Sequence, residues 1–174
     1  HSCRALTRLS MPDSVTSIGD SAFGSCAALA TVRLGTGVAS LGTYAFADCP
    51  ALTSLLLPEN SLSSIAEGAF RGCSALTSIE IPHSVTSLSP SAFDWCSALT
   101  RITLGARVRL TGPLILEGCD RLEFIDVHPL NSQLSSTDGV LLDKARTTLI
   151  RCPRGKAGTY EISSGVVHIG EGAF

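Results

Sequence analysis

The strongest constraint on this 174-residue chain is a segment, Ala-Phe-x-x-Cys-x-x-Leu, that recurs at nearly equal intervals. It reads AFGSCAAL at residues 22–29, AFADCPAL at 45–52, AFRGCSAL at 69–76 and AFDWCSAL at 92–99. Alignment on the cysteine extends the series to six residues spaced 23 or 24 apart: Cys3, Cys26, Cys49, Cys73, Cys96 and Cys119. Apolar residues recur three, six and eight positions after each of them. Repetition at this period is typical of solenoid proteins.

Each repeat contains the pattern of one β-strand followed by a turn. In LTSIEIP (76–82), apolar and polar residues alternate, as expected for a strand that buries one face. Pro or Gly follows the strand in the regular repeats and predicts a turn. The return segment SVTSLSPSAFDWC (84–96) offers Ser89 as a helix N-cap and Pro90 as the first residue of a short helical turn.

A repeat of 23 residues is too short to enclose a hydrophobic core of its own. We therefore expect the copies to stack, so that the inward side chains of each turn pack on those of its neighbours. Equivalent strands then form a parallel sheet with a spacing of about 4.8 Å. The recurring Phe and Cys side chains are expected to lie inside this stack as continuous ladders.

The pattern L-x-x-I-x-I-P-x-S-V-x-x-I-x-x-x-A-F-x-x-C resembles the BspA-like class of leucine-rich repeats. The match is close over residues 3–118, weakens through 119–127 and resumes at EISSGVVHIGEGAF (161–174). The resemblance implies an α/β solenoid, a right-handed superhelix with parallel strands on its concave face and short helical turns or irregular segments on its convex face. We expect one continuous domain, truncated at both ends: regular repeats at 1–127, a hairpin-like insertion at 128–160 and a resumed repeat at 161–174.

The repeat pattern is disturbed near the insertion. Thr111 stands in a usually aliphatic column, and Ile115-Leu116 replace Ala-Phe, so we expect looser or differently shaped packing in the fifth repeat. A small-molecule or lipid pocket beneath it is a minor alternative function. Within the insertion, GVLLDKARTTLIRC (139–152) predicts a hairpin around the polar turn 143–146.

Composition excludes several function classes. The net charge of −2 lacks the basic excess of a dedicated nucleic-acid binder, so nucleic acid is not an expected partner. No apolar run approaches 18 residues, so no membrane span is predicted. The chain begins without Met and lacks a visible signal peptide, which we attribute to the expected truncation.

The cysteines and histidines do not form a recognisable catalytic or metal-binding motif. Stacked cysteines lie farther apart than the Cβ separation of about 3.8 Å that a disulfide needs, and the paired C-x-x-C spacing of zinc sites is missing. We therefore expect buried free thiols that act as small hydrophobic residues. Cys152 lies outside the ladder and is the one thiol considered for reactivity. We predict no catalytic residues, no metal, no cofactor and no enzymatic activity.

The best candidate binding surface is the outward side of the strands, which we call the strand face. If the residues six and eight positions after each cysteine point inward, those five and seven positions after it point outward. The face is mostly small and polar, with occasional Arg, Leu and Phe, and arginine and aromatic anchors among near-neutral contacts resemble the composition of a protein interface, although a plain solvated sheet is the alternative. Leu56 and Phe124 are expected to be exposed without a structural need. The candidate residues are Arg8, Arg33, Leu56, Glu80, Arg101, Phe124 and Asp126.

A second candidate is the basic segment at 144–156, which contains no acidic residue. Its cations could contact phosphate, a sulfated glycan or an acidic protein patch. The favoured alternative is a solvated hairpin whose charges discourage pairing at a sheet edge. The five residues are Lys144, Arg146, Arg151, Arg154 and Lys156.

The resemblance implies a bacterial cell-surface or secreted protein that attaches to host or neighbouring-cell proteins. Extracellular-matrix or plasma proteins are the expected partners, bound through the strand face. The alternative is a scaffolding repeat protein, which could be intracellular, that mediates self-association or complex assembly. Fold-level similarity alone does not establish either activity.

Overall fold

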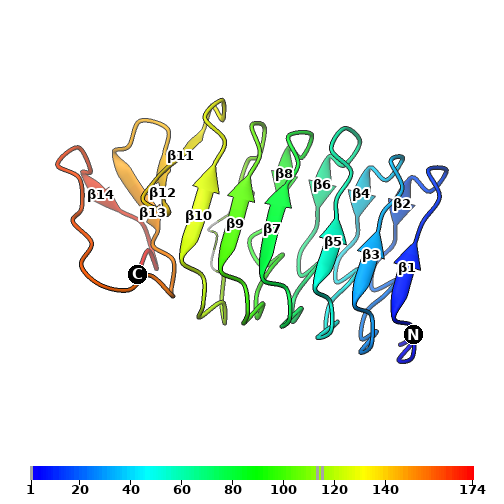
Figure 1. Cartoon of the computed structure of the whole chain (residues 1–174). Helices are drawn as coiled ribbons and strands as arrows, with labels where there is room; N and C mark the ends of the chain where they lie inside the picture. The colour runs from blue at the N-terminus through cyan, green and yellow to red at the C-terminus, as the bar shows by residue number, and fades with distance from the viewer. Residues whose placement is uncertain (1, 113, 115) are drawn as a thin grey trace.

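The computed structural model describes residues 2–112, 114 and 116–174, and Figure 1 shows a row of stacked turns with the termini at opposite ends. Strands and loops make up each turn, and no helix occurs within the described ranges. The first series of strands comprises β1 (Arg8–Ser10), β3 (Thr31–Arg33), β5 (Ser54–Leu56), β7 (Ser78–Ile81), β9 (Arg101–Leu104) and β10 (Phe124–Val127). The second series comprises β2 (Ser17–Ile18), β4 (Ser40–Leu41), β6 (Ser64–Ile65) and β8 (Ser87–Leu88).

The first-series strands pair in parallel, one repeat apart, as predicted. Residues equivalent in the repeat lie opposite each other, for example Leu9 with Val32 and Ile102 with Ile125. The pairing forms two three-stranded parts, β1-β3-β5 and β7-β9-β10. The break between β5 and β7 falls in the single 24-residue repeat, whose extra residue shifts the chain after β5. The parallel solenoid is therefore confirmed, with one interruption in its strand pairing.

The second series forms a separate parallel sheet in the order β2-β4-β6-β8. Its apolar residues are equivalent in the repeat and point into the core, with exposed fractions of 5% or less: Ile18, Leu41, Ile65 and Leu88. This sheet was not expected from the sequence, because each of its strands is only two residues long. Strands that short leave almost no alternation to detect.

The expected α/β class is corrected in one respect, since turns take the place of the helical pieces in the described chain. The residue before each regular cysteine has a left-handed backbone, with φ from +55° to +73°. An α-helix of L-residues cannot continue through such a position. Ser89 and Pro90 therefore begin a turn, in agreement with the irregular segments named as the second option. The six left-handed residues are Ser2, Ser25, Asp48, Gly72, Trp95 and Gly118.

Backbone N–H groups of the turn segments find their hydrogen-bond acceptors in the neighbouring repeat. Phe23 N–H donates to Ala45 O over 2.8 Å, and Phe46 N–H donates to Ala69 O over 2.8 Å. The same bond joins Phe70 to the next turn along. Buried peptide groups need such partners, so each turn depends on the turn that follows it.

Four phenylalanine rings form a continuous stack through the core. The centroids of Phe23, Phe46, Phe70 and Phe93 are separated by 5.2, 5.7 and 5.4 Å, with nearly parallel planes. Phe46, Phe70 and Phe93 are completely buried. Such offset stacking adds to the gain from burying apolar area. The predicted phenylalanine ladder is confirmed.

The cysteines form a second ladder beside the rings. Cys26, Cys49, Cys73, Cys96 and Cys119 are buried and free, whereas Cys3 is exposed. Each of the last four thiols donates to the carbonyl oxygen of a phenylalanine in the preceding repeat, over 3.1 to 3.3 Å. The prediction of buried free thiols is confirmed for these five, and the thiol adds a contact between turns.

The chain after β10 forms a small sheet of its own. It contains β11 (Leu134–Thr137), β12 (Val140–Asp143), β13 (Thr148–Arg151) and β14 (His168–Ile169). β12 and β13 pair antiparallel, which confirms the predicted hairpin, while β13 and β14 pair in parallel. Asp143 closes the hairpin by accepting hydrogen bonds from Thr147 N–H and Thr148 N–H. The proposed boundaries of 1–127, 128–160 and 161–174 stay a prediction.

The fifth repeat departs only partly from its neighbours. Thr111 donates from its hydroxyl to Leu88 O over 3.3 Å, so a hydrogen bond between turns accompanies the loss of an aliphatic side chain. Leu114 and Leu116 are buried. The substitution at Ile115 lies outside the described residues.

Replacement of Phe70 by Ala tests the ring stack. We expect the free energy of unfolding to fall by about 3–5 kcal/mol, because the variant leaves a cavity between two buried rings. Phe174→Ala is the matched control, since it lies in the same column of the repeat but its side chain is 69% exposed. Its effect should stay within about 0.5 kcal/mol. Urea unfolding followed by circular dichroism measures both, and equal losses would contradict a stabilising role of the stack.

Candidate functional site

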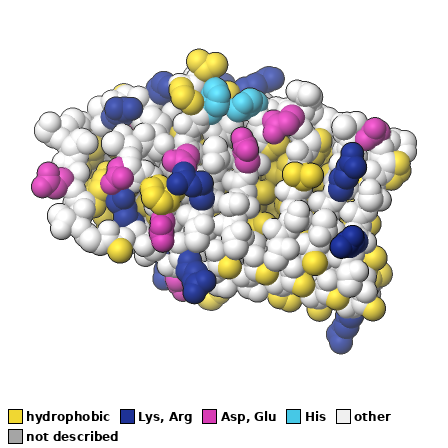
Figure 2. All heavy atoms as spheres, viewed as in Figure 1, with side chains coloured by type: hydrophobic (Ala, Val, Ile, Leu, Met, Phe, Trp, Pro, Cys, Tyr) yellow, Lys and Arg dark blue, Asp and Glu magenta, His cyan; other side chains and the backbone are white. Residues whose placement is uncertain are grey.

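The strand face has the register predicted from the repeat. Its rows on β1, β3 and β5 are Arg8–Thr31–Ser54 and Ser10–Arg33–Leu56. Its rows on β7, β9 and β10 are Ser78–Arg101–Phe124 and Glu80–Thr103–Asp126. Figure 2 shows this side as a mainly polar surface with scattered charged and apolar side chains. The candidate residues therefore lie on one face, in two groups separated by the break between β5 and β7.

Arg33 and Leu56 form an accessible pair on this face. They lie opposite each other on β3 and β5, and Leu56 is 66% exposed. Arg33 is exposed, and within the described chain no carboxylate lies at ion-pair distance from it. An open guanidinium beside an open leucine provides both a charged and an apolar contact for a partner.

Three other strand-face residues interact with each other. The Arg101 guanidinium lies 4.3 Å from the centroid of the Phe124 ring and forms an ion pair with Asp126. Phe124 is half-buried and also lies against Gly139, where a Cβ atom would come within 2.9 Å of the ring. The expectation that Phe124 is exposed without a structural need is therefore wrong. The ring supports the turn that precedes β12.

Two cations of the basic segment are neutralised by ion pairs that its sequence does not indicate, and a third makes a hydrogen bond to the backbone. Arg154 forms an ion pair with Asp120 over 2.9 Å. Lys156 forms an ion pair with Asp138 over 2.9 Å. Lys144 donates from Nζ to a backbone carbonyl over 3.0 Å. These contacts reduce the positive charge that the segment offers to a ligand.

The remaining two residues of the basic segment differ in accessibility. Arg151 is 8% exposed and donates to the carbonyl of Gly172, so it lies inside the fold. Arg146 is exposed at the tip of the hairpin and has a left-handed backbone. Only Arg146 in this segment presents its charge without a described hydrogen-bond or ion-pair partner.

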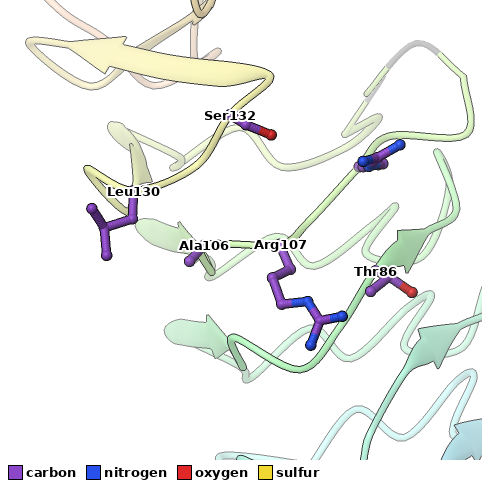
Figure 3. A pocket seen from close by; sticks show the side chains of 6 residues that line it. Thr86, Ala106, Arg107, Leu130 and Ser132 are labelled. Atoms are coloured by element: carbon purple, nitrogen blue, oxygen red, sulfur yellow. The ribbon is translucent and has the colours of Figure 1, made fainter.

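Sequence reasoning did not find a second pair of cations, Arg107 and Arg109, in the loop that follows β9. Arg107 and Arg109 line an open hollow of about 510 Å3, shown in Figure 3. The available signal was the absence of Asp and Glu from 81–93, 104–116 and 127–137. The net charge of the whole chain hides this local excess of positive charge, because acidic strand and turn residues lie between the three segments.

The buried thiols are poor nucleophiles. Desolvation raises the pKa of Cys49 and Cys119 to about 11. It raises the pKa of Cys73 and Cys96 still further, and it also raises the pKa of Cys152. Since the thiolate is the reactive form, these groups are almost fully protonated at neutral pH. Cys152, which was considered for reactivity, is packed in a small cluster of buried residues.

The described part of the chain contains no group of three or more His, Cys, Asp or Glu side chains arranged to hold a metal ion. Nor do the described residues include a helix of the length and hydrophobicity that spans a membrane. Accessible features of the described residues include the strand face and the hollow beside Arg107 and Arg109.

Comparison with known families gives one strong match. Residues 1–135 match, in six copies, the family model described as BspA type leucine rich repeat region. None of the curated proteins compared with the chain matches it.

Several solved structures resemble the chain over most of its length. A leucine-rich repeat protein from Eubacterium ventriosum is 27% identical, covers 94% of this chain and 43% of its own, and has a TM-score of 0.79. A leucine rich cell surface protein from Faecalibacterium prausnitzii is 26% identical, with coverages of 97% and 58% and a TM-score of 0.63. The pneumococcal vaccine antigen PcpA, at 20% identity, coverages of 97% and 52% and a TM-score of 0.72, shares the fold. The chain spans about half the length of these relatives.

Thiol labelling tests the burial of the cysteine ladder. In the native chain at mildly alkaline pH, iodoacetamide should label exposed Cys3 rapidly and leave the six buried cysteines protected. Because their pKa values are raised, labelling of Cys49 and Cys119 should accelerate only as the pH approaches about 11. Mass spectrometry of the labelled peptides identifies each site, with the urea-unfolded chain as the control. Rapid native labelling of Cys152 would contradict its packed position.

Proposed function

Because this chain belongs to the BspA-type leucine-rich repeat family, we propose that it is a non-enzymatic module that binds proteins through its strand face. The observation that carries the proposal is the open pair Arg33 and Leu56 on a rigid parallel sheet. A leucine that is 66% exposed has no role in the core, and arginine is one of the residue types enriched among the side chains that contribute most to protein binding. Three of the four other outward residues on β1, β3 and β5 are small and polar, namely Ser10, Thr31 and Ser54, so a partner can approach this part of the face closely.

The rigidity of the strand face supports this function. The β1-β3-β5 part is held by backbone pairing on both sides of β3, and its inward residues pack on the core. A partner therefore meets side chains whose backbone is already ordered, so less conformational entropy is lost on binding. The Arg101–Phe124–Asp126 group adds a second feature on β9 and β10, although its residues also stabilise each other.

We propose a location at the bacterial cell surface or outside the cell. The relative from Faecalibacterium prausnitzii is described as a leucine rich cell surface protein, which supports this location. The partners proposed are host or neighbouring-cell proteins, with extracellular-matrix and plasma proteins tested first. The chain spans about half of its solved relatives, so the proposal concerns the part of those proteins that it matches.

One observation supports the alternative function as a scaffold. All seven cysteines are free, as is usual for proteins in a reducing compartment. In that case the partner of the strand face is a second copy of the chain or another member of an intracellular complex.

Substitution of the accessible pair tests the strand-face proposal. Arg33→Ser with Leu56→Ser should weaken binding to an extracellular-matrix or plasma protein by roughly tenfold to a hundredfold, because both anchors are lost. Surface plasmon resonance against a panel of immobilised proteins measures the effect at two salt concentrations. The same chain in analytical ultracentrifugation reports self-association.

Arg4→Ser with Val167→Ser is the matched control. It also removes one exposed arginine and one exposed aliphatic side chain, but both lie outside the strand face. The proposal predicts wild-type binding for this control. Binding that survives in the Arg33 and Leu56 variant would move the site elsewhere. Self-association without binding to the panel, lost in that variant, would favour the scaffold.

A further inference from the structure

The hollow at one edge of the solenoid is built by three successive loops, which follow β7, β9 and β10 (Figure 1). We call it the upper-edge hollow, from its place in Figure 1. It is open to solvent and has a volume of about 510 Å3. The lining residues, drawn in Figure 3, are Thr86, Ala106, Arg107, Arg109, Leu130 and Ser132.

The polar groups of the hollow follow the period of the repeat. Thr86, Arg109 and Ser132 stand 23 residues apart and so occupy the same position in consecutive turns. At about 4.8 Å between neighbouring turns, the three side chains span roughly 10 Å along the solenoid. A row of hydroxyl, guanidinium and hydroxyl groups fits an extended polar ligand better than a compact one.

The upper edge is positive although the chain has a net charge of −2. Arg107 and Arg109 are exposed, and the described residues place no carboxylate at ion-pair distance from either. Lys144 and Arg146 line a second hollow, on the other side of the loop 128–134. Figure 2 shows Lys, Arg and His side chains gathered at this edge. Cations therefore stand on both sides of that loop.

Buried Asn131 holds the loop between the two hollows in place. Its side-chain NH2 donates to Gly105 O and Val108 O, each over 3.0 Å. Its side-chain oxygen accepts from Gln133 N–H and Leu134 N–H, each over 2.9 Å. With an exposed fraction of 1% and all four bonds made, Asn131 ties the loop to the preceding turn. The wall of the hollow is therefore formed before a ligand arrives.

We propose that the upper-edge hollow binds a sulfated polysaccharide. Arg107 and Arg109 supply planar guanidinium groups, which pair with the oxygens of a sulfate ester through two parallel hydrogen bonds. The hydroxyls of Thr86 and Ser132 provide further donors and acceptors for sulfate and sugar oxygens. Lys144 and Arg146 extend the positive charge along the polymer. This site is separate from the strand face, and the proposal does not rest on the function proposed for that face.

The lining of the hollow favours this ligand over other polyanions. The described residues that line it include no aromatic side chain, whereas single-stranded nucleic acids are held largely by bases stacked on aromatic rings. A bound peptide would be expected to insert an apolar anchor, but the described lining contains a single large apolar side chain, Leu130, which is 78% exposed and extends away from Arg107 in Figure 3. The hollow therefore offers little apolar surface to receive such an anchor. Hydroxyls and guanidinium groups remain, and both suit a hydrated, charged sugar chain.

Calorimetry with heparin, a sulfated polysaccharide, tests the proposal on the whole chain. Arg107→Gln with Arg109→Gln should weaken binding about tenfold or more, because two charge-assisted contacts are lost. Arg8→Gln with Arg33→Gln is the matched control, since it makes the same change in net charge at exposed arginines of the strand face. The control should change the affinity less than about twofold. Circular dichroism confirms that both variants stay folded.

Chemically desulfated heparin, a poly-glutamate peptide and a DNA oligonucleotide define the ligand class. The proposal predicts that desulfated heparin loses binding and that the other two bind more weakly than heparin. Equal losses in the two double variants would overturn the site, because they would reflect net charge alone. Poly-glutamate or DNA binding as tightly as heparin, with the same dependence on Arg107 and Arg109, would overturn the ligand class.

Discussion

The structure depends on contacts between repeats, because a single described turn can neither provide hydrogen-bond partners for all its backbone groups nor enclose a hydrophobic core. Phe23 N–H donates to a carbonyl in the next turn, and the Cys49 thiol returns a bond to the Phe23 carbonyl over 3.2 Å. The rings of Phe23 and Phe46 stack beside these bonds at 5.2 Å. Backbone, ring and thiol therefore all act between repeats. Stability in such a protein is approximately a sum of nearest-neighbour contacts, so each turn orders the next.

The insertion follows the same constraint, although its strands are antiparallel. Cys152 N–H donates to Ala173 O over 2.7 Å, and Ala173 holds the same place in the repeat as Ala45, whose carbonyl accepts from Phe23 in the regular turns. Gly155 N–H donates to Leu122 O, which ties the end of the hairpin to the turn before it. The core nevertheless divides at this point, since Val140, Leu149, Cys152 and Ala173 form a cluster separate from the main core. Contacts between turns thus continue across a change in sheet topology.

Stacking also determines which surfaces are available for binding. The strand face and the upper-edge hollow are both built from equivalent positions of consecutive repeats. A substitution in one repeat therefore changes one residue in a row of equivalent residues. Arg33 and Leu56 are neighbours in one such row, and Thr86 and Arg109 are neighbours in another. The paired strands and turns of the repeats hold the backbone under these side chains in place. A repeat protein can in this way carry two chemically different surfaces on one core, as proposed here.

Features that repeat with the period of the chain could be predicted from the sequence alone. The register of Arg33 with Leu56, the buried cysteines and the phenylalanine ladder follow from the spacing, because equivalent residues must meet when identical turns stack. The turns in place of helices required the structure, since their left-handed positions hold Ser, Asp and Trp as well as Gly.

Contacts between non-equivalent positions were decided only by the tertiary structure. Arg154 meets Asp120 across 34 residues, and Phe124 is covered by Arg101 and the turn at Gly139. The upper-edge hollow likewise needs a loop held by Asn131. No local pattern or period encodes such pairs, because they arise where the insertion folds back on the regular turns. The sequence thus determined the repeating frame, and the packing of its one irregular part decided which charges stay free.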